Sequence, residues 1–199
     1  LVLPPKVAPI QVVIVPIYKS DEAKETVFPK LNEIREQLES KKIRVHVDDR
    51  NELTPGYKFN DWELKGVPLR IEIGPKDIEK QQVILAKRYN REKRSVGFNE
   101  IGKIVTILDE IQKDMLKIAR EKAKENTINI SDYSEFKLKI GKGGFFNAYW
   151  CGKTECEEKI KEETGADIRV IPFGSENTKG KCIYCQEQSI TISIFARGY

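Results

Sequence analysis

The feature that most constrains the fold is an apolar run near the start of the chain. Residues 10–17 read Ile-Gln-Val-Val-Ile-Val-Pro-Ile, which is typical of a central strand covered on both faces. Residues 23–38, behind the potential N-cap Ser20, repeat apolar side chains every three or four positions and predict a helix, with a kink at Pro29 or a start near it. Residues 43–47 alternate like a second strand. A strand, a helix and a strand at this spacing predict a parallel pair with a crossover helix, and therefore an α/β domain.

The stretch of residues 54–77 combines aromatic, basic and acidic side chains, reading TPGYKFNDWELKGVPLRIEIGPKD. A short helical pattern places Phe59, Trp62 and Leu64 near one face, and the alternation of residues 69–73 predicts a half-buried strand. Rings stack on unpaired bases, while arginines and carboxylates bond to base edges, so these residue types suit the reading of single-stranded RNA. An amphipathic helix and strand with solvated surface charges is the alternative interpretation.

The composition permits RNA binding without demanding it. A third of the 199 residues are charged, yet the net charge is only +4, so a basic surface has to be local. Residues 87–94 carry five basic residues around Tyr89, which predicts phosphate or base contacts against the alternative of a solvated hairpin tip. The single histidine, His46, falls on the polar face of its strand, and we interpret it as solvent-facing rather than as a catalytic base. The sequence contains no apolar run of about 18 residues, so no membrane span is expected.

The second half of the chain has its own pattern. A helical stripe covers residues 100–125, and residues 127–132 interrupt it, which predicts a domain boundary there. Residues 133–150 then predict a helix, a glycine-rich turn and a strand. Residues 154–157 (Thr-Glu-Cys-Glu) fit a capping box with Thr154 as the N-cap, which places a cysteine in the first helical turn, where the helix dipole favours a thiolate.

All four cysteines lie close together in the sequence, at Cys151, Cys156, Cys182 and Cys185. Two pairs of thiolates at this spacing suit tetrahedral zinc in a closed, structural site. Free thiols and two disulfides are the alternatives, and the disulfides are disfavoured because the rest of the chain resembles a cytosolic protein. We therefore expect a structural rather than a catalytic metal.

The run PGYKFNDWELKGVPLRIEIGPKD resembles the signature of the anticodon-binding domain of prolyl-tRNA synthetases, the class II enzymes, of the archaeal and eukaryotic type. The arrangement of the cysteines and the final tyrosine resemble the C-terminal zinc domain of the same family, and the proline-rich start resembles the linker that precedes the anticodon-binding domain. The resemblance covers essentially the whole chain. It implies a linker of residues 1–9, an α/β anticodon-binding domain of residues 10–126 with a mixed sheet flanked by helices, and a smaller α+β zinc-binding domain of residues 127–199.

The resemblance also implies the anticodon contacts. Phe59 would stack on a base, and Glu63 would accept hydrogen bonds from a guanine edge. Arg70 would donate to a base or a phosphate. Asp77 and Lys93 would complete the contacts to the two guanines of the proline anticodon. The residue types agree, because carboxylates accept from guanine N1–H and its amine while cationic side chains donate to O6 and N7.

The implied function is tRNA recognition within a proline–tRNA ligase, whose whole form uses ATP to attach proline to its tRNA. The sequence lacks the ATP-binding motifs of the catalytic core and begins at Leu1 without an initiator methionine, so we expect a cytoplasmic C-terminal piece that is inactive alone. Its expected partners are proline tRNA and its own catalytic domain, and the carboxylate of Tyr199 would reach toward the active site of that domain. The full-length enzyme is expected to be a homodimer. Neither DNA nor a membrane is expected as a partner. The alternative is a stand-alone RNA-binding accessory module with the same fold. An independent active site is disfavoured because the sequence shows no Cys–His pair, nucleophile elbow or paired carboxylates.

Overall fold

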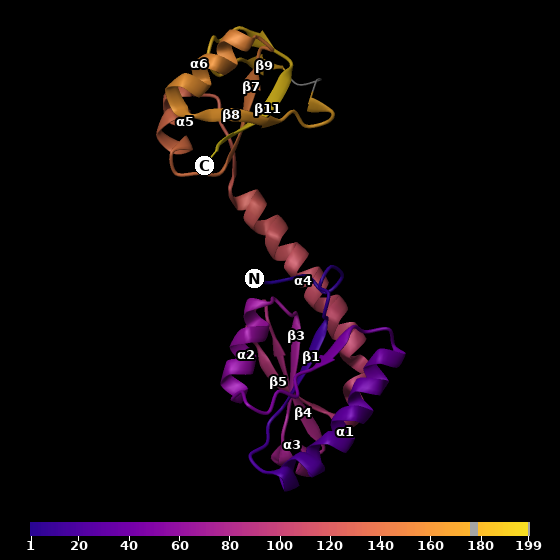
Figure 1. The fold of residues 1–199 in the computed structure, drawn as a ribbon. Helices are drawn as coiled ribbons and strands as arrows, with labels where there is room; N and C mark the ends of the chain where they lie inside the picture. The colour runs from indigo at the N-terminus through magenta and orange to yellow at the C-terminus, as the bar shows by residue number, and fades with distance from the viewer. Residues whose placement is uncertain (176–178, 199) are drawn as a thin grey trace. The chain divides into compact units, whose positions relative to one another are not determined.

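The computed structural model describes residues 1–175 and 179–198. Contacts divide the chain into two units, Leu1–Ile118 and Ala119–Tyr199, each with its own sheet and helices (Figure 1). The division falls inside helix α4 (Ile104–Glu125), before the boundary expected between residues 126 and 127. In the part of the chain that the structure describes, no helix combines the length and apolarity that crossing a membrane requires.

The first unit is built on a five-stranded mixed sheet in the order β2-β1-β3-β4-β5. Its strands are β1 (Val12–Pro16), β2 (Val45–Val47), β3 (Leu69–Ile73), β4 (Gln82–Lys87) and β5 (Lys93–Gly97). Strand β1 runs parallel to β2 and β3, whereas β3 and β5 each run antiparallel to β4. Helix α1 (Asp21–Ser40) joins β1 to β2, which confirms the predicted parallel pair with a crossover helix.

Helices cover both faces of this sheet. Helices α1 and α4, the latter preceded by the 3-10 helix η1 (Phe98–Lys103), share a core with Val12 and Ile14 of β1. Helix α2 (Pro55–Leu64) packs on the opposite face, where its Trp62 meets Val13 and Val15. A short helix, α3 (Pro75–Glu79), follows β3. The two faces of β1 are therefore both buried, as the continuous apolar run predicted.

Helix α1 begins directly after Ser20, the residue that the sequence predicts as its N-cap. The Oγ atom of Ser20 accepts a hydrogen bond from the backbone N–H of Ala23 at 3.3 Å. The helix continues through Pro29, so the predicted start near that residue is wrong. A proline inside a helix costs about 3 kcal/mol, and buried side chains on both sides of it, including Val27 and Leu31, offset that cost.

The first nine residues are irregular, as their prolines predicted, but they are held against the first unit. The backbone N–H of Leu3 donates to the carbonyl of Gly66 at 3.1 Å, and the guanidinium of Arg44 donates to the carbonyls of Pro5 and Ala8, both at 3.0 Å. His46 of β2 is exposed, as predicted.

Strand β3 is more buried than its alternation predicted. All five residues are buried, and the exposed fractions of Arg70 and Glu72 are only 8% and 7%. The strand lies between β1 and β4, and these two charged residues bond to each other and to side chains from neighbouring elements instead of to water. Leu64, which was expected on the apolar face of α2, is 75% exposed at the end of that helix.

The second unit is a four-stranded sheet in the order β6-β7-β11-β8, with two helices and a small hairpin. The strands are β6 (Thr127–Asn129), β7 (Phe145–Trp150), β8 (Ala166–Val170) and β11 (Thr191–Arg197). The helices are α5 (Tyr133–Ile140) and α6 (Thr154–Thr164), and the hairpin pairs β9 (Gly180–Lys181) with β10 (Gln188–Ser189). Its core contains three fully buried phenylalanines, and the ring of Phe136 contacts the rings of Phe146 and Phe195 edge to face.

Helix α6 begins one residue earlier than predicted. Thr154 is its first helical residue, the N-cap is Lys153, and no side chain caps the helix, so the predicted capping box is absent. The left-handed Gly152, at φ +85°, turns the chain after β7, and the carbonyl of Lys153 becomes the first acceptor, bonding to the N–H of Cys156 at 3.2 Å. Cys156 nevertheless lies in the first turn, as expected.

Candidate nucleic-acid interface and metal centre

Four of the five predicted RNA contacts come together over β3, around Arg70. The Nε and Nη2 atoms of Arg70 donate to Oε1 of Glu72 at 3.0 and 2.9 Å, and Nη1 donates to Oε1 of Glu63 at 3.2 Å. The ammonium of Lys93 lies 2.8 Å from the same oxygen of Glu72. The ring of Phe59 lies 4.1 Å from the guanidinium carbon of Arg70. We name these five residues the Arg70 cluster.

Local structure explains how residues from three elements meet there. Phe59 and Glu63 are one turn apart on α2 and therefore share a side of that helix. Arg70 and Glu72 are two apart on β3 and share a face of the sheet. On β4, Ala86 pairs with Arg70 on one side and with Lys93 on the other, so a small side chain separates the two cations.

The cluster is charge-balanced and only partly exposed. Arg70 and Glu72 are buried, whereas the side chains of Glu63 and Lys93 are 38% and 51% exposed. A buried charge is tolerated when it is paired and hydrogen-bonded, and each buried member here has two partners of opposite charge. What faces outward is a carboxylate, an ammonium and a half-buried ring, beside a hollow of about 90 Å³. The surface can therefore accept hydrogen bonds, donate hydrogen bonds and stack against a planar group.

Glu72 was not among the predicted site residues. Its position two residues after Arg70 was a usable signal, because alternate residues of a strand share a face. The alternation of residues 69–73 predicts a solvent-facing side of the strand, and on such a side a carboxylate beside an arginine has no special role. Burial of the second face of β3 makes this carboxylate the common acceptor for Arg70 and Lys93.

Asp77, the fifth predicted contact, lies apart from the other four within the described structure. It is in the first turn of α3, where its Oδ2 atom accepts from the backbone N–H of Gly74 at 3.0 Å. No bond from it to the Arg70 cluster occurs among the described residues. It lines a different hollow, of about 480 Å³, together with Tyr18 and Lys76.

The basic hairpin between β4 and β5 is tied back to the domain. The hydroxyl of Tyr89 donates to Asp114 of α4 at 2.7 Å. Burial and this bond raise the pKa of Tyr89 to about 12. The ammonium of Lys87 lies 2.8 Å from Glu92, and the guanidinium of Arg88 donates to the backbone carbonyl of Glu63 at 3.2 Å. The segment is thus a hairpin, as the alternative interpretation held, but three of its side chains are fixed by protein contacts.

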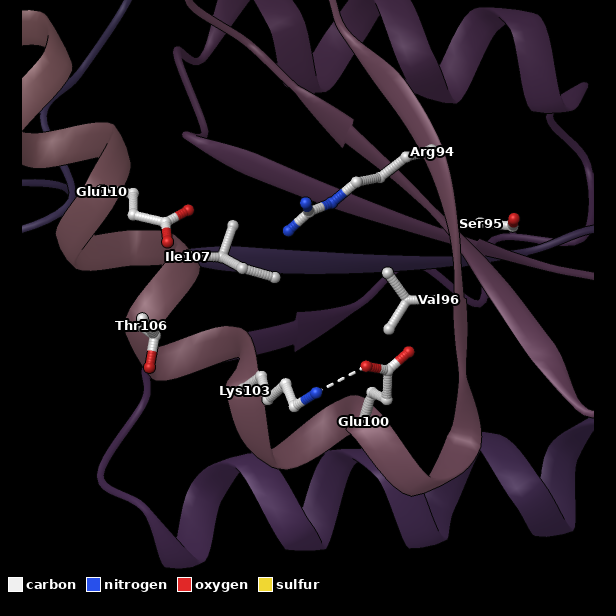
Figure 2. A pocket seen from close by; sticks show the side chains of 8 residues that line it. All are labelled: Arg94, Ser95, Val96, Glu100, Lys103, Thr106, Ile107 and Glu110. Carbon is white, nitrogen blue, oxygen red and sulfur yellow. Dashed lines mark hydrogen bonds and ion pairs between the residues drawn. The ribbon is translucent and has the colours of Figure 1, made fainter.

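The same hairpin borders a further hollow, which lies on the other face of the sheet from the Arg70 cluster. Arg94 follows Lys93 in β5, and successive residues of a strand point to opposite faces. Figure 2 shows Arg94 directed toward α4, in a hollow of about 360 Å³ that Val96 and Ile107 also line. None of the five predicted contact residues lines this hollow.

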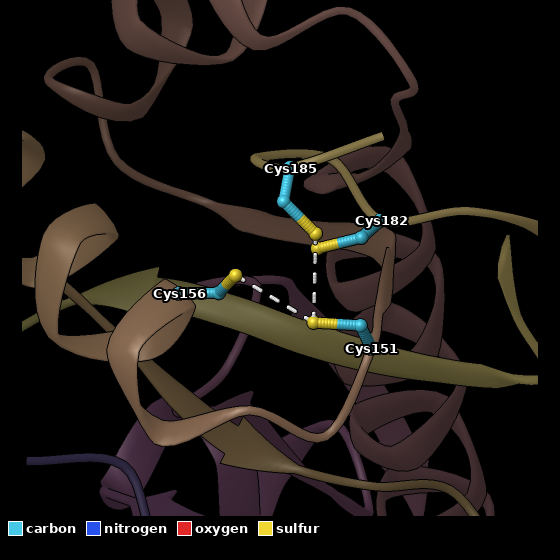
Figure 3. A group of neighbouring side chains, drawn as sticks. All are labelled: Cys151, Cys156, Cys182 and Cys185. Carbon is cyan, nitrogen blue, oxygen red and sulfur yellow. Dashed lines mark hydrogen bonds between the residues drawn. The ribbon is translucent and has the colours of Figure 1, made fainter. Parts of the chain in front are cut away.

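The four cysteines form a compact group (Figure 3). Their sulfur atoms all lie within 4.8 Å of one another, with Cys151 at 3.6 Å from Cys156 and 3.7 Å from Cys185. Sulfurs at the corners of a tetrahedron around a metal, with bonds of about 2.3 Å, lie about 3.8 Å apart, whereas a disulfide bond is about 2.05 Å long. All four cysteines are free. The group could therefore hold a metal ion.

Three structural elements supply these sulfurs. Cys151 follows β7, Cys156 is in the first turn of α6, and Cys182 and Cys185 flank the turn between β9 and β10. That turn is closed by a bond from the N–H of Gln186 to the carbonyl of Cys182 at 3.0 Å. The sequence pairs C-x4-C and C-x2-C are thus brought to one point.

Burial is the main influence on the pKa of two of these thiols. It raises the pKa of Cys151 and of Cys156, and neighbouring thiols raise that of Cys156 further. The thiolate expected at Cys156 from the helix dipole is therefore not favoured without a cation. At Cys182 burial also raises the pKa, but backbone N–H groups of Cys185 and Tyr184 outweigh it and lower the pKa. A bound cation would favour the thiolate at every position.

The remaining predicted site residue, Tyr199, lies outside the described residues, which end at residue 198.

Comparisons with known proteins assign both units. Residues 11–108 match the family model described as the anticodon binding domain, and residues 133–199 match that of the prolyl-tRNA synthetase C-terminal domain. Proline–tRNA ligase 2 of Clostridioides difficile is 45% identical over 201 residues, which are 100% of this chain and 41% of that protein. Proline–tRNA ligase of Cenarchaeum symbiosum is 46% identical over 202 residues, 100% of this chain and 42% of that protein.

A solved structure agrees with these matches. A prolyl-tRNA synthetase from Cryptosporidium parvum, in complex with L-proline and AMP, has a TM-score of 0.89 and 37% identity, covering 100% of this chain and 43% of that one. The chain thus spans about two fifths of the length of its curated relatives. Matches to two successive domain models, to sequences and to a structure agree: this chain belongs to the prolyl-tRNA synthetase family, of which it comprises an anticodon-binding domain and the C-terminal domain.

Proposed function

We propose that the first unit of this chain binds the anticodon loop of proline tRNA through the Arg70 cluster. The observation that carries the proposal is the outward side of that cluster, where the carboxylate of Glu63, the ammonium of Lys93 and the ring of Phe59 share one surface. These are the three kinds of group that recognise an unstacked base: an acceptor, a donor and a stacking face.

A guanine matches this surface. Its N1–H and exocyclic amine donate, which suits the partly exposed Glu63, while its O6 and N7 accept, which suits Lys93. Phe59 stacks on the base. Arg70 donates from the floor of the surface, and its bond to Glu63 keeps that carboxylate directed at the base. Such fixed partners lower the entropy lost on binding.

The second guanine of the anticodon binds beside Asp77. The hollow of about 480 Å³ that Asp77 lines is large enough for a small planar ligand. One carboxylate oxygen of Asp77 caps α3, which leaves the other oxygen to accept from the base. The two guanines are thus read at separate places.

The whole protein attaches proline to its tRNA in an ATP-dependent reaction. Relatives that are named proline–tRNA ligases, and of which the chain spans about two fifths, support this proposal. In this proposal the whole protein is a cytoplasmic homodimer, and its catalytic domain binds ATP and proline and meets the C-terminal Tyr199. The chain by itself binds tRNA but does not activate proline, which an assay of proline-dependent ATP turnover would test.

The ion held by the four cysteines is a structural zinc. A closed set of four thiolates is characteristic of such sites and leaves no position for a substrate. The sulfur spacings support tetrahedral coordination. Zinc would fix α6 to the β9–β10 turn, because those elements contribute three of the ligands.

Nucleotide footprinting of the chain on full-length proline tRNA tests the proposed function. Protection confined to the anticodon loop is the expected result. Protection spread evenly along the tRNA would contradict it and would favour a stand-alone RNA-binding module that recognises only the phosphate backbone.

A further inference from the structure

Asp48 is a fully buried carboxylate that the anticodon contacts leave unexplained. Asp48 follows β2 and has no exposed surface. Two side chains donate to its carboxylate and a third donates to its backbone carbonyl. Arg50 donates to its two oxygens at 2.8 and 2.7 Å, and the indole N–H of Trp62 donates at 2.7 Å. The ammonium of Lys58 donates to its backbone carbonyl at 3.1 Å. Burial raises the pKa of Asp48, but the hydrogen bonds from Arg50 and Trp62 outweigh this effect and lower the pKa to about 2.

The network reaches α2 at three points. Lys58 and Trp62 bond to Asp48 directly, and Asp61 bonds to Arg50 at 2.8 Å. Residues three and four apart are neighbours on a helix, so these three residues form one side of α2. We name Asp48, Arg50, Lys58, Asp61 and Trp62 the Asp48 network.

The adjacent side of the same helix carries two members of the Arg70 cluster. Phe59 and Glu63 each follow a member of the network by one residue, which is about 100° around the helix. A rotation of α2 about its axis would therefore move both Phe59 and Glu63 relative to Arg70. Binding groups need to be held to about 0.5 Å and 10–20° to act together.

Apolar packing fixes the rotation of α2 only weakly. The buried residues of this helix are Lys58 and Trp62 alone. The apolar cluster at this helix is small: Trp62 packs with Val13, Val15 and Val67, and Ile10 and the helix's own Phe59 are only partly buried against it. Directional hydrogen bonds to Asp48 supply the orientation that so few apolar contacts leave open.

We propose that Asp48 is a positioning residue for base recognition: by holding one side of α2, it sets the places of Phe59 and Glu63 over Arg70. The inference rests on the proposed function, because it concerns the same surface. Asp48 does not touch RNA, since it is fully buried. Its loss should reduce the preference for the proper bases without altering the contacts of exposed basic residues with phosphates.

The test measures two quantities for the full chain. The first is the affinity for proline tRNA divided by that for the same tRNA with both anticodon guanines replaced. The second is the slope of the logarithm of the affinity against the logarithm of the salt concentration, which reflects the number of phosphates contacted. Asp48→Asn keeps the shape of the side chain and removes its charge. Asp49→Asn is the matched control, because Asp49 is the next residue and is exposed.

We expect Asp48→Asn to lower the base preference by about tenfold, the value of one good base contact, with an unchanged salt slope. Asp49→Asn should keep the wild-type preference. Folding of each variant is checked by its melting curve. A folded Asp48→Asn protein with the wild-type preference would overturn the inference, since the network would then only stabilise the fold.

Trp62→Phe covers the case in which Asp48→Asn does not fold. It keeps an aromatic ring in the apolar cluster and removes the N–H that donates to Asp48. The preference should fall in this variant too, and an unchanged value would overturn the inference. Failure of the proposed function is distinguishable: in that case the wild-type chain itself would show no preference for the native anticodon.

Discussion

Arg70 and Glu72 lie two residues apart on β3, and two nitrogens of Arg70 donate to a single carboxylate oxygen of Glu72, at 3.0 and 2.9 Å. Lys93 approaches the same oxygen to 2.8 Å. One buried carboxylate therefore holds both cations of the cluster. Their positions are fixed by the protein itself, so little side-chain freedom has to be lost when a base binds.

Arg70→Ala should weaken the binding of proline tRNA by roughly 1–3 kcal/mol and relax the base preference. The variant loses a donor and also releases Glu63, which Arg70 holds at 3.2 Å. Titration of labelled tRNA measures both effects. Arg94→Ala is the control, because Arg94 lies on the opposite face of the sheet, and its base preference should stay at the wild-type value. Unchanged affinity and preference in Arg70→Ala would refute the role given to this residue.

The stability of the first unit should depend on Asp48 at low pH. The folded-state pKa of Asp48 is about 2, below its ordinary value of 3.8, so its contribution is present above pH 4. The contribution is lost as the pH falls toward 2, and it amounts to about 2 kcal/mol. Urea unfolding of the wild type and of Asp48→Asn should therefore differ most above pH 4 and converge toward pH 2. A difference that is independent of pH would contradict the assigned pKa.

Tyr89→Phe should affect stability rather than RNA binding. The variant loses the hydrogen bond from the Tyr89 hydroxyl to Asp114, which should cost about 1 kcal/mol in the free energy of unfolding. The affinity for tRNA should stay within twofold of the wild type, since the hydroxyl is engaged inside the domain. Denaturant melts and a tRNA titration on the same preparation give both values. A large loss of tRNA affinity with unchanged stability would instead assign Tyr89 to the RNA contact suggested by its basic neighbours.

Protein purified under reducing conditions should contain about one zinc per chain. Removal of the metal should lower the melting temperature of the second unit, and Cys182→Ser should abolish zinc binding while the exposed control Ser134→Ala retains it. The chain has two tryptophans, so in a Trp62→Phe background the fluorescence of Trp150, next to Cys151, reports on the metal site alone. Less than about half an equivalent of zinc, with the thiols oxidised, would rule out the structural role.

Much of the fold follows from periodicity. The strand, helix and strand at the start of the chain, the helix Tyr133–Ile140 and the strand Phe145–Trp150 all occur where their patterns predict them. The errors arise where tertiary contacts outweigh local preference. Helix α1 passes through Pro29 because its buried side chains lie on both sides of it, and β3 is buried on both faces because charged residues there find partners within the protein.

The site was only partly predictable for the same reason. Resemblance supplied Phe59, Glu63, Arg70 and Lys93, and the structure brings these four together. Glu72 and Asp48 were missed because their value lies in contacts with residues from other elements, which no local pattern records. The side-chain direction of Tyr89 could not be predicted either, since its partner Asp114 lies 25 residues further along the chain, on α4.

The most direct test of the account is the affinity of the unmodified chain for proline tRNA and for the same tRNA with both anticodon guanines replaced, each at two salt concentrations. The account predicts a clear preference for the native anticodon that persists at the higher salt, because base-edge contacts do not depend on counterion release. Equal affinities that fall steeply with salt would contradict it, since they would mean that the chain contacts only the phosphate backbone.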